Sequence, residues 1–105
     1  MAMQLKANVD YWNDAGIGNF SLHYVRDQQK REVDFLITRE DKPWLLVESK
    51  LSETEIPISL THMARYLKPE HCALVTHTPT SARIRVIDGI HILVSQASEF
   101  LANLG

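Results

Sequence analysis

Hydrophobic and polar positions repeat with different periods along this chain, and each change of period marks an expected element. Leu5, Val9 and Trp12 recur at helical spacing and predict a helix over residues 3–15. Apolar runs rich in β-formers then follow between short polar turns and predict three strands, over residues 20–26, 32–38 and 44–50. Because the turns between them are short, consecutive strands are expected to pair antiparallel.

The second half of the chain predicts a helix, a buried strand, a hairpin and a last helix. Residues 57–67 have a helical pattern, and the apolar run 72–76 is typical of a buried strand. A strand, a crossover helix and a strand in this order favour a parallel pairing of the two strands. Residues 83–94 predict a hairpin whose turn is an Asp-Gly pair, and Ser95 is expected to cap the final helix.

Length and charge narrow the class of protein. The chain has 105 residues, enough for one hydrophobic core, so a single domain over residues 1–105 is expected. Its 13 acidic and 11 basic residues leave a net charge of -2, whereas a freestanding nucleic-acid-binding domain usually has a basic excess. Any contact with DNA therefore needs a local basic patch or help from another domain.

Cysteine content and hydropathy favour the cytoplasm. Cys72 is the single cysteine, so an internal disulfide is excluded and a reducing compartment is favoured. No apolar stretch approaches the length that spans a membrane, and none near the start resembles a secretion signal.

Acidic residues interrupt two of the apolar strands. Asp34 lies within the run VDFLI, and Glu48 directly follows WLLV. A carboxylate on such a strand has to be paired, hydrogen-bonded or bound to a cation. Lys50 shares a face with Glu48, because side chains two residues apart on a strand point the same way. If the neighbouring strand brings Asp34 to that face, two carboxylates and an ammonium can hold a divalent metal and an activated water.

A simpler interpretation of the same residues is also open. Glu48 and Lys50 would form an ion pair on one face, and Asp34 would bond to a neighbouring arginine, as is common on protein surfaces. Other chemistry has less support, because the five histidines have no paired spacing and one cysteine cannot build a zinc site. No glycine-rich phosphate loop is present, so no ATPase site is expected in this chain.

The motif and its strand order resemble the PD-(D/E)XK nuclease superfamily, with Asp34 on the second strand and Glu48-Ser49-Lys50 on the third. More narrowly, the segments REVDFL and KPWLLVESKLS look like the C-terminal domain of unknown function at the end of many prokaryotic AAA-type ATPases. The similarity extends over nearly the whole chain. It implies an α/β fold of the restriction-endonuclease-like type, with an αβββαβ core, a mixed sheet flanked by helices, and an extra C-terminal hairpin and helix.

The resemblance also implies a site. Asp34 and Glu48 would bind Mg²⁺ or Mn²⁺, with the backbone carbonyl of Ser49 as a further oxygen ligand. Lys50 would orient or help deprotonate the attacking water and stabilise the charge that develops on phosphate. The implied activity is metal-dependent hydrolysis of DNA phosphodiester bonds.

An alternative is a catalytically inactive module of the same ATPase family that binds DNA or protein, which the negative net charge and the acids of the first helix favour. Val33 stands where the superfamily's name has a proline, which is a common variation. Many active members carry an acid on the first helix, where the candidates here are Asp10 and Asp14, and Asp14 lies opposite the apolar face.

Partners follow from the resemblance and from the charge pattern. An AAA-type ATPase domain in cis or in trans is expected, and the chain is expected to be the C-terminal fragment of a larger ATPase. Open sheet edges would also allow a homodimer. Basic residues that could follow a DNA backbone cluster around the two turns of the meander: Arg26, Lys30, Arg31, Arg39 and Lys42.

Overall fold

The computed structural model describes residues 2–25, 33–50 and 56–104. Within these ranges the helices and strands follow one another in the order α1 (Ala2–Asp14), β1 (Phe20–Val25), β2 (Val33–Arg39), β3 (Lys42–Lys50), α2 (Ile58–Leu67), β4 (His71–Thr76), β5 (Arg83–Ile87), β6 (Ile90–Gln96) and α3 (Ala97–Leu104). Every element expected from the hydrophobic pattern is present. None of these helices is both long enough and apolar enough to cross a membrane.

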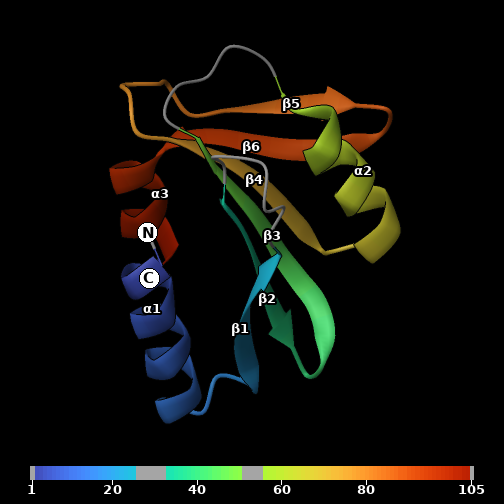
Figure 1. Cartoon of the computed structure of the whole chain (residues 1–105). Helices are drawn as coiled ribbons and strands as arrows, with labels where there is room; N and C mark the ends of the chain where they lie inside the picture. Colours follow the sequence, from blue (N-terminus) through green and yellow to red (C-terminus); the bar gives the residue numbers. More distant parts are fainter. Residues whose placement is uncertain (1, 26–32, 51–55, 105) are drawn as a thin grey trace.

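The strands of the described chain form one mixed sheet in the order β1-β2-β3-β4-β6-β5 (Figure 1). The first three strands pair antiparallel as a meander. Strand β4 pairs parallel with β3 after the crossover through α2, and β6 pairs parallel with β4. Strand β5 returns antiparallel beside β6 as the C-terminal hairpin. The α/β fold with a mixed sheet and an extra hairpin and helix is thereby confirmed.

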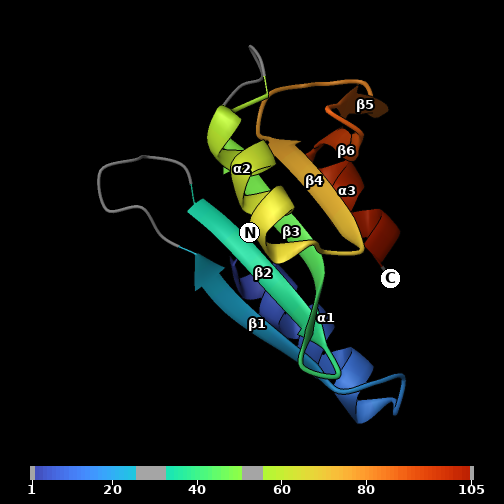
Figure 2. The same cartoon turned by 90° about the vertical axis from the view of Figure 1, so that its right-hand side faces the viewer.

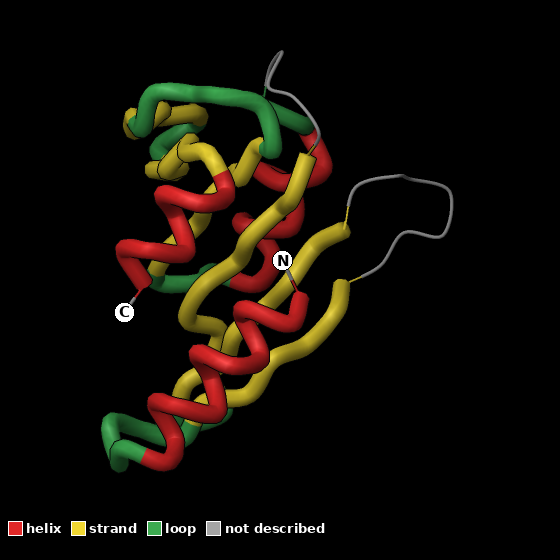
Figure 3. The backbone as a smooth tube through the Cα atoms, turned by 90° about the vertical axis from the view of Figure 1, so that its left-hand side faces the viewer, coloured by secondary structure: helices red, strands yellow, loops and turns green. Residues whose placement is uncertain are grey.

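Helices cover both faces of the sheet. Helix α2 lies across one face (Figure 2), and α1 and α3 lie across the other (Figure 3). The alternation along β3 explains why both faces are covered, since Leu45 and Val47 join the core beneath α1 and α3 whereas Leu46 joins the core beneath α2. All three side chains are buried, which is typical of a central strand with parallel pairing.

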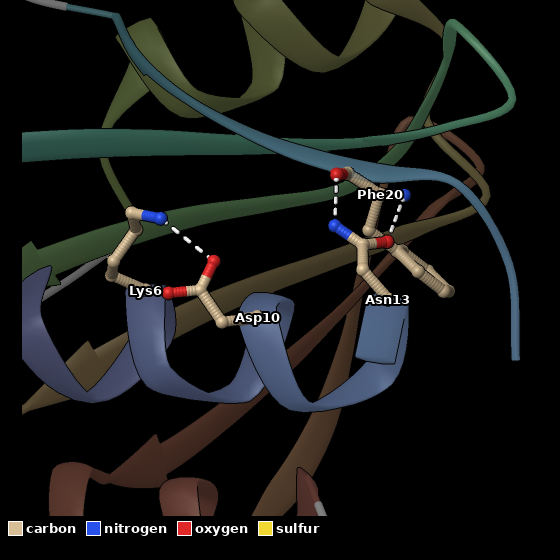
Figure 4. Close-up of polar contacts among 4 residues, drawn as sticks. All are labelled: Lys6, Asp10, Asn13 and Phe20. Atoms are coloured by element: carbon tan, nitrogen blue, oxygen red, sulfur yellow. Dashed lines mark hydrogen bonds and ion pairs between the residues drawn. The ribbon is translucent and has the colours of Figure 1, made fainter. Parts of the chain in front are cut away.

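A side-chain amide fixes α1 to the beginning of β1. The amide nitrogen of Asn13 donates to the carbonyl of Phe20 at 2.8 Å, and its oxygen accepts from the Phe20 amide at 2.7 Å (Figure 4). The Trp12 and Phe20 rings then pack with their centroids 5.0 Å apart. One polar side chain thus satisfies both backbone groups of the first strand residue, where the chain enters the sheet.

The C-terminal hairpin turns as the Asp-Gly pair predicts, but the expected helix cap is wrong. Asp88 and Gly89 have φ angles of 52° and 81°, as a two-residue turn of type I′ requires. Ser95 is a buried residue of β6 paired with Val75, and its hydroxyl donates to the carbonyl of Gln96. Pairing with β4 therefore extends the strand through the position at which the sequence pattern begins a helix.

Candidate functional site

Strand register places Asp34 directly opposite Glu48, with β2 and β3 antiparallel. The two strands pair through the short turn between them, and the ladder has one register shift, between Ile37 and Thr38, before it continues to Asp34 and Glu48. Residues directly opposite on paired strands share a face of the sheet. The side chain of Asp34 lies outside the part of the chain that the structure describes, so its predicted role as a ligand stays a prediction.

The carboxylate of Glu48 is buried within the sheet. Only 1% of the residue is exposed, and the three residues before it are also buried. The hydroxyl of Ser59, from the first turn of α2, donates to Glu48 Oε1 at 3.4 Å. This contact shows that Glu48 faces α2, as the even-numbered Leu46 does. A buried carboxylate is costly to desolvate and is therefore informative about function.

Ser49 and Lys50 complete the predicted motif where β3 ends, and His77 joins them. Both motif residues are partly exposed. The Ser49 hydroxyl lies 3.0 Å from His77 Nε2, and the His77 backbone N–H donates to the carbonyl of Lys50 at 3.1 Å. The segment after β4 therefore lies directly against the backbone of the motif.

Threonines position that segment. The buried Thr76 hydroxyl lies 3.0 Å from the Thr78 carbonyl and 2.8 Å from the Thr80 hydroxyl. Thr80 also donates to the Thr78 carbonyl, at 3.2 Å. These contacts define the path of the chain immediately after β4, and with it the position of His77.

The motif lies at the carboxyl ends of parallel strands. Lys50, the last residue of β3, pairs in register with Thr76, the last residue of β4. In open α/β sheets ligands characteristically bind outside these ends, where loops rather than the next strand meet the side chains. The topology thus brings Glu48, Ser49 and Lys50 to the edge at which such a fold places its sites.

Ser59 and His77 are neighbours of the motif that sequence reasoning missed. Neither has a local signal, because Ser59 contacts Glu48 across a helix–sheet interface and His77 contacts Ser49 across two parallel strands. The strand register alone, had it been known, would have placed His77 beside the motif.

The acids of α1 point to other partners or to solvent. Asp10 pairs with Lys6 at 2.7 Å along the exposed side of the helix (Figure 4), and Asp14 is exposed at its last position. Among the described side chains, no three of the types His, Cys, Asp and Glu lie close enough to hold a metal ion. That statement does not cover Asp34, whose side chain is not described.

Two of the predicted basic residues lie at the turn between β2 and β3. Arg39 and Lys42 are exposed and pair in register, and the Arg39 guanidinium lies 5.6 Å from the centroid of the Phe20 ring. This turn is at the opposite end of β3 from Lys50. The remaining members of the predicted patch lie outside the described residues: Arg26, Lys30 and Arg31.

Comparison with known proteins identifies one family. Its description is a domain of unknown function (DUF4143), and the match extends over residues 4–96. The search of curated proteins found no match. The matched range includes the whole sheet and the motif of Glu48, Ser49 and Lys50. Because the match covers most of the chain, the protein belongs to the DUF4143 family.

Proposed function

We propose that this chain is a nuclease-like domain of the PD-(D/E)XK type, which hydrolyses DNA phosphodiester bonds with Mg²⁺ or Mn²⁺. The observation that carries the proposal is the register of Asp34 opposite a buried Glu48. Removing a carboxylate from water into the interior of a sheet is costly. A cation bound at that position offsets this cost.

The residues at the end of β3 fit a hard divalent cation. Carboxylates of Asp34 and Glu48 and the carbonyl of Ser49 would supply oxygen ligands, which Mg²⁺ and Mn²⁺ prefer. Such an ion lowers the pKa of a bound water and neutralises charge on the phosphate. Lys50 is partly exposed on the same strand end and would orient the water and stabilise the negative charge that develops in the transition state.

The same proposal assigns a partner. The segments around the motif resemble domains at the C-terminal end of prokaryotic AAA-type ATPases, and the chain itself has no glycine-rich phosphate loop. We therefore assign nucleotide hydrolysis to an ATPase domain in cis or in trans. In this arrangement the ATPase would deliver or remodel the DNA that the present domain cleaves.

Calorimetric titration with Mn²⁺ tests the metal site. The wild type is expected to bind Mn²⁺ with a dissociation constant in the micromolar to millimolar range, and Asp34→Asn to lose saturable binding. Asp41→Asn is the matched control, because Asp41 lies exposed in the β2–β3 turn with φ of 64°, a conformation that asparagine tolerates. It makes the same chemical change within the same hairpin.

Cleavage of supercoiled and branched DNA in Mn²⁺ then tests the reaction. Activity in the wild type and in Asp41→Asn, with loss in Asp34→Asn and Lys50→Ala, supports the nuclease. Circular dichroism establishes that all four proteins fold. Metal binding by Asp34→Asn equal to that of the wild type would contradict the proposed site.

A second candidate function is a catalytically inactive module that binds DNA or protein in the same ATPase family. The specific observation in its favour is that Asp10, the better-placed acid of α1, pairs with Lys6 on the exposed side of the helix. An unchanged response to Mn²⁺ in folded Asp34→Asn and wild type alike favours this candidate over the nuclease.

A further inference from the structure

Strand β5 forms an outer edge of the described sheet, and its side chains are open to solvent. Within the described ranges it pairs with β6 alone. Ile84 is 65% exposed and Val86 is 58% exposed, although both are large apolar residues. Helix α3 packs against β4 and β6, so it covers the neighbouring strands and leaves these two side chains exposed.

The two faces of β5 differ in chemistry. Ile84 pairs with Leu93, which packs on the core beneath α1 and α3, so the apolar residues of β5 lie on that face. Arg85 pairs with Ile92, which belongs to the core beneath α2. Arg83 and Arg85 therefore alternate with Ile84 and Val86, and both arginines are exposed.

A cavity of about 360 Å³ adjoins the apolar face of β5. Its apolar wall is formed by side chains from β3, β5, β6 and α3, namely Trp44, Ile84, Leu93, Phe100 and Leu104. A volume of this size accepts a large apolar side chain, and buried anchors of this kind dominate the energetics of protein interfaces.

We propose that β5 and this cavity bind an extended segment of a partner protein in which apolar and acidic residues alternate. The segment adds a strand to the sheet, so backbone hydrogen bonds supply part of the affinity. Its apolar side chains cover Ile84 and Val86 and fill the cavity, while its acids lie opposite Arg83 and Arg85. Opposite charges directly across a strand pair are stabilising.

Charge favours this occupant over a second copy of the chain. If two β5 strands pair antiparallel with Ile84 opposite Val86, Arg85 of one copy lies opposite Arg85 of the other. Like charges directly opposite each other destabilise a strand pair. An acidic segment from a different protein removes that repulsion and retains the apolar contact.

This surface is separate from the proposed nuclease site. The cavity borders Trp44 and His71 near the amino ends of β3 and β4, whereas Glu48 and Lys50 lie at the carboxyl end of β3. Loss of Mn²⁺ binding in Asp34→Asn and loss of segment binding in β5 variants therefore test the two proposals independently.

The test uses a fluorescein-labelled peptide in which glutamate alternates with leucine around a central phenylalanine. Fluorescence anisotropy is expected to show saturable binding to the wild type, at least tenfold weaker in Ile84→Asn. Ile58→Asn is the matched control, because Ile58 is 85% exposed on α2, and it is expected to bind like the wild type. Equal binding by both variants would overturn the proposal.

Reversing the charge of Arg85 distinguishes a specific contact from loss of structure, because an unfolded variant would not bind the lysine peptide more tightly. Arg85→Glu is expected to weaken the glutamate peptide at least tenfold and to strengthen binding of the corresponding lysine peptide. Sedimentation velocity measures self-association of the wild type at the same concentrations. A wild-type dimer that Ile84→Asn dissociates would identify a second copy as the occupant and overturn the proposal.

Discussion

Glu48 is a charged residue buried among the apolar residues of the described sheet. Three buried apolar residues precede it on β3, and Glu48 itself is as well buried as they are. From α2, the hydroxyl of Ser59 donates to Glu48 Oε1 at 3.4 Å. A buried carboxylate is costly to desolvate, and buried charged groups are common at functional sites.

Thermal unfolding with and without Mn²⁺ tests this interpretation at residue scale. At ten times its dissociation constant, a ligand that binds only the folded state contributes about 1.4 kcal/mol. For a domain of this size that raises Tm by roughly 5–10 °C. The wild type and the exposed control Glu99→Gln are expected to show the increase, and Glu48→Gln to lose it. An equal increase in Glu48→Gln would exclude its carboxylate as a ligand.

At the scale of elements, α2 forms the cover over the face on which Glu48 lies. The helix begins after Pro57, whose φ of -63° suits this position, and it ends at Lys68, whose φ of 52° is left-handed. The Lys68 N–H donates to the carbonyl of Ala64 at 2.9 Å, which closes the last turn. Buried Leu60 then packs α2 onto the sheet.

Substitutions on the two sides of α2 measure how much the packing of this helix on the sheet contributes to the free energy of unfolding. Leu60 is fully buried and Ile58, two residues earlier, is 85% exposed. Leu60→Ala is expected to lower the free energy of unfolding by about 2–5 kcal/mol, because it removes buried methyl groups and leaves a cavity. Ile58→Ala is expected to change it by less than about 0.5 kcal/mol. Urea denaturation measures both, and similar losses would contradict the described orientation of α2.

At the scale of the whole molecule, charge limits what the domain does alone. The net charge of -2 repels a DNA backbone, so any contact depends on local clusters such as Arg39 and Lys42 at the β2–β3 turn. An ATPase domain that supplies most of the phosphate contacts would resolve this imbalance. The present domain would then cleave the DNA, and the ATPase domain would supply most of the affinity for it.

Weak DNA binding by the isolated domain follows from this charge balance. At physiological salt we expect a dissociation constant of roughly 10⁻⁴ M, the weak end of non-specific binding. Lys42→Gln is expected to weaken it further and to reduce the salt dependence by about one released counterion. Lys6→Gln, an exposed lysine on α1, serves as the control. Fluorescence anisotropy measures these dissociation constants. Submicromolar DNA binding by the domain alone would contradict the expectation that an ATPase domain supplies most of the phosphate contacts.

Local sequence patterns were sufficient for the elements and for the core of the motif. The helical spacing of Leu5, Val9 and Trp12 predicted α1, and the short turn before Pro43 predicted the antiparallel pairing of the strands that carry Asp34 and Glu48. These features depend on residues close together in the chain, where side-chain period and turn length limit the backbone to few conformations.

Contacts between distant segments were beyond the reach of these patterns. Ser95 has the side chain of a helix cap, yet pairing with β4 keeps it in a strand. Ser59 and His77 contact the motif because α2 and β4 pack and pair with β3. Neither contact produces a periodic pattern or a fixed spacing in the sequence, so neither could be predicted from it.

The amino-acid sequence by itself determined the order and type of the helices and strands, the mixed α/β class and the position of the acidic motif. Only the tertiary structure decided that Glu48 is fully buried beneath α2, that His77 lies against Ser49, and that β5 leaves Ile84 and Val86 exposed. The physical reason is that backbone conformation responds mainly to near neighbours, whereas burial depends on which distant surfaces meet.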